Sequence, residues 1–297
     1  MLIVENLVKK FNNTTAVNNI SFVVKPGTIF GLLGPNGAGK TTTIRTILNI
    51  IKPTSGKILF NDSVITDEFF NIIGYLPEER GLYRKSKVID TIIYFAELKN
   101  LSRQTAVQKA DKWLKKLSIG EYRERKLEEL SKGNQQKVQF ITSVIHDPQL
   151  MIFDEPFAGF DPINQQEIKD LIFSFRSEGK IIILSTHQMD TAERLCSEIF
   201  LINKGKEVRS GTLTKIRNEF GTRHIKLEFK GDGTFIKTLP EVAAFDNYGN
   251  YAEIKLKDDV NPSAFLRKIV GEIDVYRFSV VEPTLNQIFI DLIKKDK

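Results

Sequence analysis

Residues 31–43 read GLLGPNGAGKTTT, and this stretch contains the pattern G-x-x-x-x-G-K-T from Gly34 to Thr41. The strand-like segment TIFGLL leads into the pattern, and the helix-like segment TTTIRTILNII follows it. Glycines let a backbone wrap closely around phosphate oxygens, and the N–H groups at the start of a helix face the anion. The stretch therefore predicts a phosphate-binding loop between a strand and a helix.

Within this loop, Lys40 is predicted to reach the β and γ phosphates of a nucleotide, and Thr41 to offer its hydroxyl to Mg²⁺. The backbone of the loop and the first turn of the helix complete the contacts. The predicted nucleotide-binding residues are Gly34, Pro35, Asn36, Gly37, Ala38, Gly39, Lys40, Thr41 and Thr42.

A second motif, QLMIFDEP at residues 149–156, is an apolar strand that ends in two carboxylates. Asp154, at the end of the strand, is predicted to hold Mg²⁺ through water. Because neighbouring side chains of a strand point to opposite sides, Glu155 points away from Asp154, toward the place of an attacking water. We expect Glu155 to be the general base or the group that polarises this water.

The composition sets limits on the rest of the chain. Of its 297 residues, 41% are hydrophobic and 27% are charged, which is typical of a globular protein. Its longest apolar runs, such as LMIF and IIIL, are far shorter than the roughly 20 residues of a membrane span. The N-terminus lacks the features of a signal peptide, and a single cysteine, Cys196, allows no internal disulfide. These features predict a cytoplasmic protein.

The net charge of +6 comes from the first 220 residues, because residues 221–297 carry 12 basic and 12 acidic side chains. This excess suits a protein that holds polyphosphate or works beside an anionic membrane. It is too small to indicate nucleic acid as a partner.

Strand-like segments alternate with helical ones along residues 1–218, which predicts an α/β domain around a largely parallel sheet. Residues 80–148 are mostly helical and predict a helical subdomain. Beyond residue 218 the chain changes to short strands and two amphipathic helices, so we expect a small α+β domain at residues 219–297.

Three further motifs make residues 1 to about 215 resemble the ATPase subunit of ATP-binding cassette (ABC) transporters. LSKGNQQK, at residues 130–137, is similar to the family signature Leu-Ser-Gly-Gly-Gln; it keeps Ser131 and Gly133 but has Lys132 and Asn134 at two other positions. FAGFDP places Asp161 where the family has an aspartate, and STHQMD places His187 at the switch histidine. The resemblance implies a P-loop NTPase fold with a mixed sheet and a helical subdomain.

In this family two ATPase domains stack head to tail, with each ATP between the phosphate loop of one domain and the signature of the other. Ser131 and Gly133, followed by a helix, still offer a hydroxyl, a close backbone approach and a helix N-terminus. We therefore predict a working signature, with Asp161 also in the nucleotide site. The alternative is that Ser131 only caps its helix.

Two other positions also follow from the resemblance. After the strand IIGYL the family has a glutamine that contacts Mg²⁺ and the membrane partner; Glu78 is expected there, as metal ligand and catalytic group beside Glu155 and His187. Glu79 is the alternative. Phe11 matches the aromatic residue that stacks on adenine, with ordinary core packing as its alternative.

The C-terminal segment EPTLNQIFIDLI resembles the accessory domain of sodium and drug exporters. Together the resemblances imply a subunit that binds and hydrolyses ATP with Mg²⁺, forms a homodimer or heterodimer, and drives export through a separate membrane permease at the inner face of the membrane. Residues 81–95, GLYRKSKVIDTIIYF, are the predicted permease contact. An ABC-type ATPase acting on ribosomes or DNA is the alternative, whereas a P-loop kinase or GTPase does not explain the signature together with His187.

Overall fold

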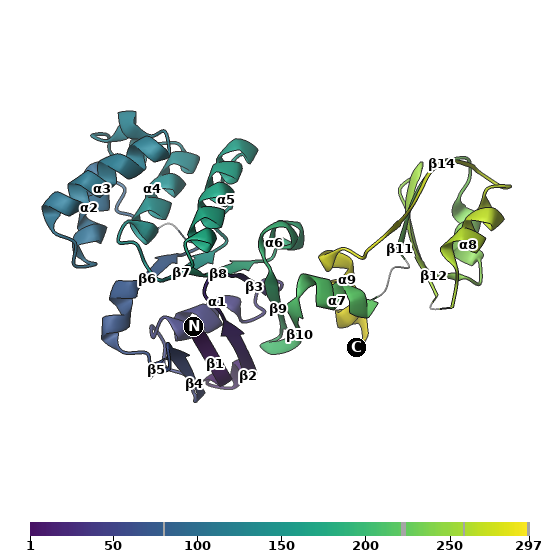
Figure 1. Ribbon diagram of the computed structural model, residues 1–297, viewed down its shortest axis with the longest axis horizontal. Helices are drawn as coiled ribbons and strands as arrows, with labels where there is room; N and C mark the ends of the chain where they lie inside the picture. The colour runs from purple at the N-terminus through teal and green to yellow at the C-terminus, as the bar shows by residue number, and fades with distance from the viewer. Residues whose placement is uncertain (80, 221–223, 258, 296–297) are drawn as a thin grey trace. The chain divides into compact units, whose positions relative to one another are not determined.

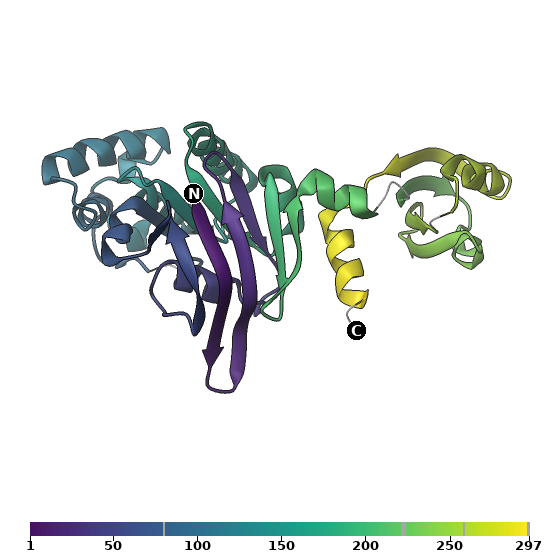
Figure 2. The same cartoon turned by 60° about the horizontal axis from the view of Figure 1, so that its bottom comes forward.

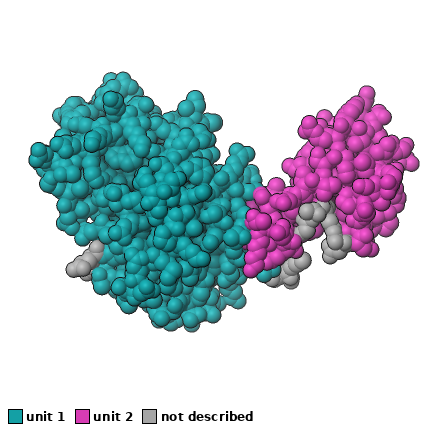
Figure 3. Space-filling model, in the orientation of Figure 1, with its two compact units in different colours: residues 1–213 teal, residues 214–297 magenta. Residues whose placement is uncertain are grey.

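The computed structural model describes residues 1–79, 81–220, 224–257 and 259–295 (Figure 1). The chain divides into two compact units, residues Met1–Leu213 and Thr214–Lys297 (Figure 3). The domain boundary between residues 218 and 219 stays a prediction. Residue 80, where the predicted helical subdomain begins, lies outside the described residues. Among the described residues, no helix has the length and apolar character needed to cross a bilayer.

A six-stranded sheet forms the centre of the first unit. Its order is β10 (Lys206–Thr212), β9 (Glu198–Asn203), β3 (Ile29–Leu33), β8 (Ile181–Thr186), β7 (Leu150–Asp154) and β6 (Ile73–Leu76). Every neighbouring pair is parallel except β9 and β10. All residues of β3, β7 and β8 are buried, as expected for strands covered on both faces. Their carboxyl ends therefore lie at one edge of the sheet.

A second, antiparallel sheet lies beside the first. It has the order β2 (Thr14–Val24), β1 (Leu2–Phe11), β4 (Ser55–Phe60) and β5 (Ser63–Val64), and Figure 2 shows β1 and β2 as long neighbouring strands. Helix α1 (Lys40–Ile47) follows the phosphate loop, and its buried residues share one apolar cluster with residues of both sheets. The predicted mixed α/β architecture is thus confirmed.

Helices surround the central sheet (Figure 1). The region after β6 contains α2 (Val88–Glu97), α3 (Arg103–Lys116) and α4 (Lys132–Val144), with short 3-10 turns at Gly120–Tyr122 and Leu127–Glu129. A further 3-10 turn, Asp67–Ile72, comes before β6. After β7 come α5 (Pro162–Ser177) and, beyond β8, α6 (Met189–Leu195).

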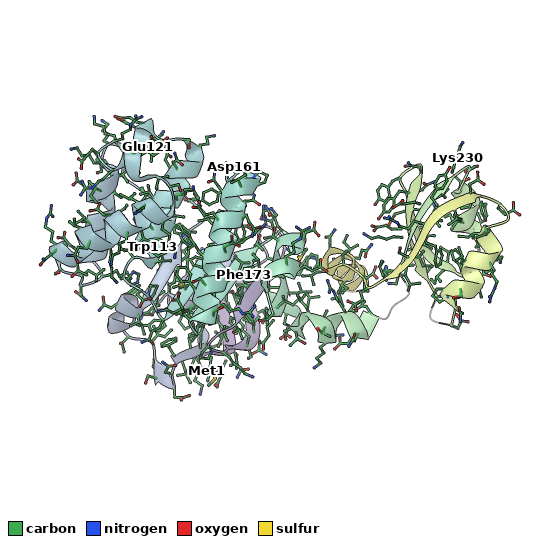
Figure 4. The ribbon with its side chains drawn as sticks, turned by 45° about the horizontal axis from the view of Figure 1, so that its top comes forward. Met1, Trp113, Glu121, Asp161, Phe173 and Lys230 are labelled. Carbon is green, nitrogen blue, oxygen red and sulfur yellow. The ribbon has the colours of Figure 1, made fainter. Side chains whose placement is uncertain are left out.

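Stacked aromatic rings join this helical region to the sheet. Phe140 on α4 lies 5.5 Å from Phe153 on β7 and 6.4 Å from Phe175 on α5, measured between ring centroids. Trp113 on α3, labelled in Figure 4, lies 6.4 Å from Phe140. Phe140 itself is fully buried at the centre of this group. Three helices and a strand thus depend on one side chain for their packing.

The second unit has its own core. Helix α7 (Leu213–Phe220) leads to a four-stranded antiparallel sheet of order β12 (Val242–Asn247), β13 (Tyr251–Leu256), β11 (His224–Lys230) and β14 (Asp274–Val281). A 3-10 turn, Thr234–Thr238, and α8 (Pro262–Ile269) pack on it, and α9 (Leu285–Lys295) ends the described chain. Phe229, Ile236 and Phe265 belong to one buried cluster. This is the α+β fold that the sequence predicts.

Replacing Phe140 by alanine should lower the free energy of unfolding of the first unit by about 3–5 kcal/mol, because the change leaves a cavity among three rings. Thermal and urea unfolding of the full chain would measure the loss. Tyr94→Ala is the matched control, since 58% of Tyr94 is exposed, and it should change stability by less than about 0.5 kcal/mol. Equal effects of the two variants would contradict the role of Phe140.

Candidate active site

A cavity of about 310 Å³ opens at the carboxyl edge of the central sheet. Four stretches distant in sequence supply its walls: β2, the phosphate loop after β3, the segment after β6, and the end of β7. The lining residues are Ala16, Asn36, Gly37, Ala38, Gly39, Lys40, Thr41, Thr42, Glu78, Asp154 and Glu155. The structure thus brings together most of the predicted loop with three of the four predicted carboxylates, Glu78, Asp154 and Glu155.

Two glycines of the loop have no room for a side chain. A Cβ atom on Gly34 would lie 2.1 Å from the carbonyl oxygen of Ile202, and one on Gly39 would lie 2.6 Å from that of Ala16. Gly39 also has a φ of 108°, which residues with a side chain rarely adopt. As the N-cap of α1, it brings no side chain to the helix N-terminus, which is left open toward the cavity for an anion.

The amino group of Lys40 lies inside the loop. It donates hydrogen bonds to the carbonyl oxygens of Gly34, at 2.7 Å, and Pro35, at 3.2 Å. Gly34 and Pro35 therefore shape the loop around the lysine rather than line the cavity. Burial lowers the pKa of Lys40, while three nearby carboxylates act in the opposite direction. Of the described residues that line the cavity, Lys40 is the one with a cationic side chain.

Thr41 and Asp154 form a pair of oxygen donors beside this lysine. The Thr41 hydroxyl lies 3.4 Å from Oδ2 of Asp154, so both point to one place in the cavity. Burial raises the pKa of the Asp154 carboxyl, and the charges of Glu78 and Glu155 act in the same direction. A nearby cation would stabilise the charged form of Asp154 and so oppose this rise in its pKa. The pair fits Mg²⁺, which prefers oxygen ligands and takes most of its shell from water and phosphate.

This arrangement differs from a metal site built from protein alone. The described part of the chain contains no group of three or more His, Cys, Asp or Glu side chains suited to a metal. Glu78 lines the same cavity, whereas Glu79 does not, although its carbonyl accepts a hydrogen bond from Gln139. Of the two alternatives, the placement favours Glu78.

Glu155 is held by residues at the end of the neighbouring strand β8. Its Oε2 accepts a hydrogen bond from the Thr186 hydroxyl at 2.8 Å. Its Oε1 lies 2.8 Å from the backbone nitrogen of His187 and 2.5 Å from Nδ1 of the His187 ring. Glu155 is 5% exposed, whereas about half of the His187 side chain is exposed. The predicted base and the predicted switch histidine are therefore in direct contact.

The signature residues lie outside the cavity, at the start of α4. Ser131 caps this helix by accepting a hydrogen bond from the Asn134 N–H at 3.2 Å, which is the alternative that the sequence left open. Capping uses an acceptor position of the hydroxyl, whose own hydrogen can still be donated. Ser131 is exposed, and the backbone of Gly133 faces Phe160, near the start of α5.

Asp161, labelled in Figure 4, occupies the N-cap of α5. Its carboxylate accepts hydrogen bonds from the N–H groups of Ile163 and Asn164. These bonds, chiefly the one from Asn164, lower the pKa of Asp161. Phe11, at the end of β1, is 46% exposed and so lies on the surface rather than in the core. Among the described residues, neither Phe11 nor Asp161 lines the cavity.

Sequence reasoning missed two residues. Ala16 lines the cavity from β2, and its carbonyl blocks any side chain on Gly39. No local signal marks it, because it reaches the loop only through folding. Thr186 stands directly before His187, and a hydroxyl residue after an apolar strand was the signal that could have identified it.

Comparison with known proteins agrees with this geometry. The ABC transporter family model matches residues 17–158. The ABC transporter ATP-binding protein YhaQ of Bacillus subtilis (strain 168) is 37% identical over 291 residues, which cover 98% of each chain. The chain belongs to the ABC transporter ATP-binding proteins. A relative from Methanocaldococcus jannaschii, MJ1023, is 47% identical over 234 residues, 79% of this chain and 84% of that protein.

Other matches cover the accessory unit and the ABC fold. The C-terminal domain of DrrA1-3-like ATP-binding proteins matches residues 211–293. The linearmycin resistance ATP-binding protein LnrL of Bacillus subtilis is 30% identical over 305 residues, 98% of each chain. A solved ATP-binding subunit of an ABC transporter has a TM-score of 0.70 and 30% identity, covering 74% of this chain and 93% of that structure.

Lys40→Met should weaken ATP binding by about 10- to 150-fold, because it removes charge-assisted contacts to phosphate but keeps an unbranched side chain. Titration of the purified chain with a fluorescent ATP analogue would measure the dissociation constant. Lys112→Met is the control, since Lys112 lies exposed on α3, away from the cavity lining. An unchanged affinity in Lys40→Met would contradict the assignment of the loop.

Proposed function

We propose that this ABC protein is the ATP-hydrolysing subunit of a transporter, in which two copies close around MgATP and drive a separate membrane permease. The observation that carries the proposal is the Glu155 carboxylate, held against His187 at the edge of the phosphate-loop cavity. A loop that cradles phosphate and a buried carboxylate beside it are the parts that hydrolysis of a phosphoanhydride needs.

In the proposed reaction, the loop backbone and Lys40 hold the polyphosphate, and Thr41 and Asp154 would hold Mg²⁺, with Glu78 beside them. The metal would neutralise negative charge on the phosphates. Glu155 accepts a proton from water while the water oxygen bonds to the γ phosphorus. The bond from that phosphorus to the β–γ bridging oxygen breaks, which leaves ADP and inorganic phosphate. His187 would stabilise charge on the γ phosphate.

Two copies are needed because one chain does not complete the site. Ser131 and the helix that it caps lie outside the cavity lined by the loop. An exposed hydroxyl and a helix N-terminus form a second phosphate-binding surface. A head-to-tail pair would bring this surface of one copy onto the ATP held by the other, and Phe11 and Asp161 would join the site there. Closure is then a shift of population toward the dimer, which binds ATP better.

Glu155→Gln should form a dimer with MgATP and remain a monomer without it, because the amide still binds but cannot take a proton. We expect hydrolysis to fall by about 10²- to 10⁴-fold. Analytical ultracentrifugation and phosphate release would measure both. Adding Lys40→Met should abolish the ATP-dependent dimer and serves as the control. A monomer in both conditions would refute the closed pair.

The surface proposed to contact the permease, which includes residues 81–95, contains two cavities. A cavity of about 280 Å³ includes Tyr75, Leu82, Phe95 and His146 in its lining, and a neighbouring cavity of about 430 Å³ includes Leu82, Arg84 and Lys132. Leu82 and Gln139 line both cavities, so the two lie side by side, and together they are called the groove. The groove contains residues of the segment 81–95 and adjoins the start of α4.

The groove also connects to the nucleotide site. Gln139 donates to the carbonyl of Glu79, next to Glu78 in the catalytic cavity. A partner seated in the groove would therefore sense the position of Glu78. The resistance function in the name of LnrL supports export as the direction. In this proposal the protein is cytoplasmic and is bound to the inner face of the membrane through the permease.

A tagged Glu155→Gln chain, purified with MgATP from detergent-solubilised membranes of its own host, should carry a polytopic membrane protein identifiable by mass spectrometry. Adding Leu82→Asp should remove that protein, because it replaces an apolar side chain that lines both cavities of the groove with a charged one. Val64→Asp is the control, since Val64 is 69% exposed on β5. Recovery of ribosomal proteins or DNA in place of a membrane protein would refute the transporter assignment.

A further inference from the structure

Thr186 contacts Glu155 but has no role in the proposed reaction. It is the last residue of β8, and 1% of it is exposed. Its hydroxyl accepts the backbone N–H of Gln188 at 3.1 Å and donates to Oε2 of Glu155 at 2.8 Å. Because the N–H of Gln188 occupies a lone pair of the hydroxyl, the hydroxyl hydrogen is directed to the carboxylate.

The two oxygens of the Glu155 carboxylate therefore have different partners. Oε2 is bound by a buried side chain at the end of a strand, whereas Oε1 is bound by His187, whose side chain is about half exposed. In the proposed reaction the His187 ring leaves Glu155 for the γ phosphate. Oε1 then loses its ring contact and becomes the oxygen that receives the proton of water.

We propose that Thr186 is a positioning residue, which fixes Glu155 through Oε2 so that Oε1 faces the attacking water after His187 has turned away. The inference rests on the proposed role of Glu155 as the base. Without Thr186, once the His187 ring leaves, the His187 backbone N–H at 2.8 Å from Oε1 would be the one remaining hydrogen bond to the carboxylate among the described residues, and the carboxylate could rotate about its last bond. A base must lie within hydrogen-bond reach of the proton that it removes, so this rotation would slow the reaction and leave ATP binding intact.

The backbone supports the same reading. The β7–β8 register pairs Asp154 with Ser185, and the Glu155 N–H donates to the Ser185 carbonyl at 2.8 Å. Glu155 has a φ of 48°, in the left-handed region that non-glycine residues seldom occupy. Such a conformation persists where surrounding contacts over-determine it. The bond from Thr186 is one of these contacts, and it brings together residues 31 positions apart.

Thr186→Val removes the hydroxyl and keeps a branched side chain of similar shape. We expect kcat for ATP hydrolysis to fall by about 10- to 100-fold, the value of one hydrogen bond to a charged group, with KM for ATP changed less than about twofold. Thr186→Ser should restore most of the rate. As a readout besides turnover, the valine variant should accumulate the MgATP-dependent dimer on ultracentrifugation, because closed pairs would wait longer for hydrolysis.

A double-mutant cycle with Glu155→Gln separates this inference from the proposed function. If Thr186 acts through Glu155, adding Thr186→Val to Glu155→Gln should lower the residual rate no further. A further drop in the double variant, or an unchanged kcat in Thr186→Val alone, would overturn the inference while Glu155 kept its role. Wild-type turnover by Glu155→Gln would instead overturn the proposed function. If the valine variant melts early, Thr186→Cys should fold and give an intermediate kcat.

Discussion

The parallel pairing of β3, β7 and β8 is the constraint on which the rest of the structure depends. These strands are buried on both faces, so polar side chains are excluded until each strand ends. Pairing of Leu33 with Thr186, and of Asp154 with Ser185, brings these ends to the same level. Because the strands are in register, the phosphate loop meets Asp154, Glu155 and His187, although more than 100 residues separate the loop from the two acids.

Burial and charge oppose each other at this edge. Removing water lowers the pKa of Lys40 and raises that of Asp154, so both groups are driven toward their neutral forms. The charges of Asp154, Glu78 and Glu155 partly offset the lowering of the Lys40 pKa. Glu78 and Glu155, however, raise the pKa of Asp154 further. A ligand that brings both negative phosphate and a divalent cation would satisfy the lysine and the aspartate together. This suits the MgATP around which the two copies are proposed to close.

Sequence predicted the parts of the site that are local. The loop from Gly34 to Thr41 is contiguous, so its spacing, together with the strand before it and the helix after it, identified it. The buried strand ending in Asp154 and Glu155 was visible for the same reason. The hydrogen bond between Thr186 and Glu155 was not visible in the sequence, because it depends on the register of β7 and β8. Ala16 was missed because the approach of β2 to the loop is set by packing between two sheets.

The Glu155–His187 hydrogen bond sets a free-energy cost that the proposed cycle must meet before hydrolysis. A hydrogen bond to a charged group is worth about 1.5–3 kcal/mol, and this bond must break before His187 can reach a phosphate. Binding of ATP to a single chain would have to supply that free energy alone. In the proposed closed pair, contacts from Ser131 of a second copy would add binding energy that is available only on closure, so the pair could meet the cost where the monomer could not. In the proposed cycle, holding Glu155 against His187 would thus favour hydrolysis after dimerisation and disfavour it before, which is the order that the proposed transport motor needs.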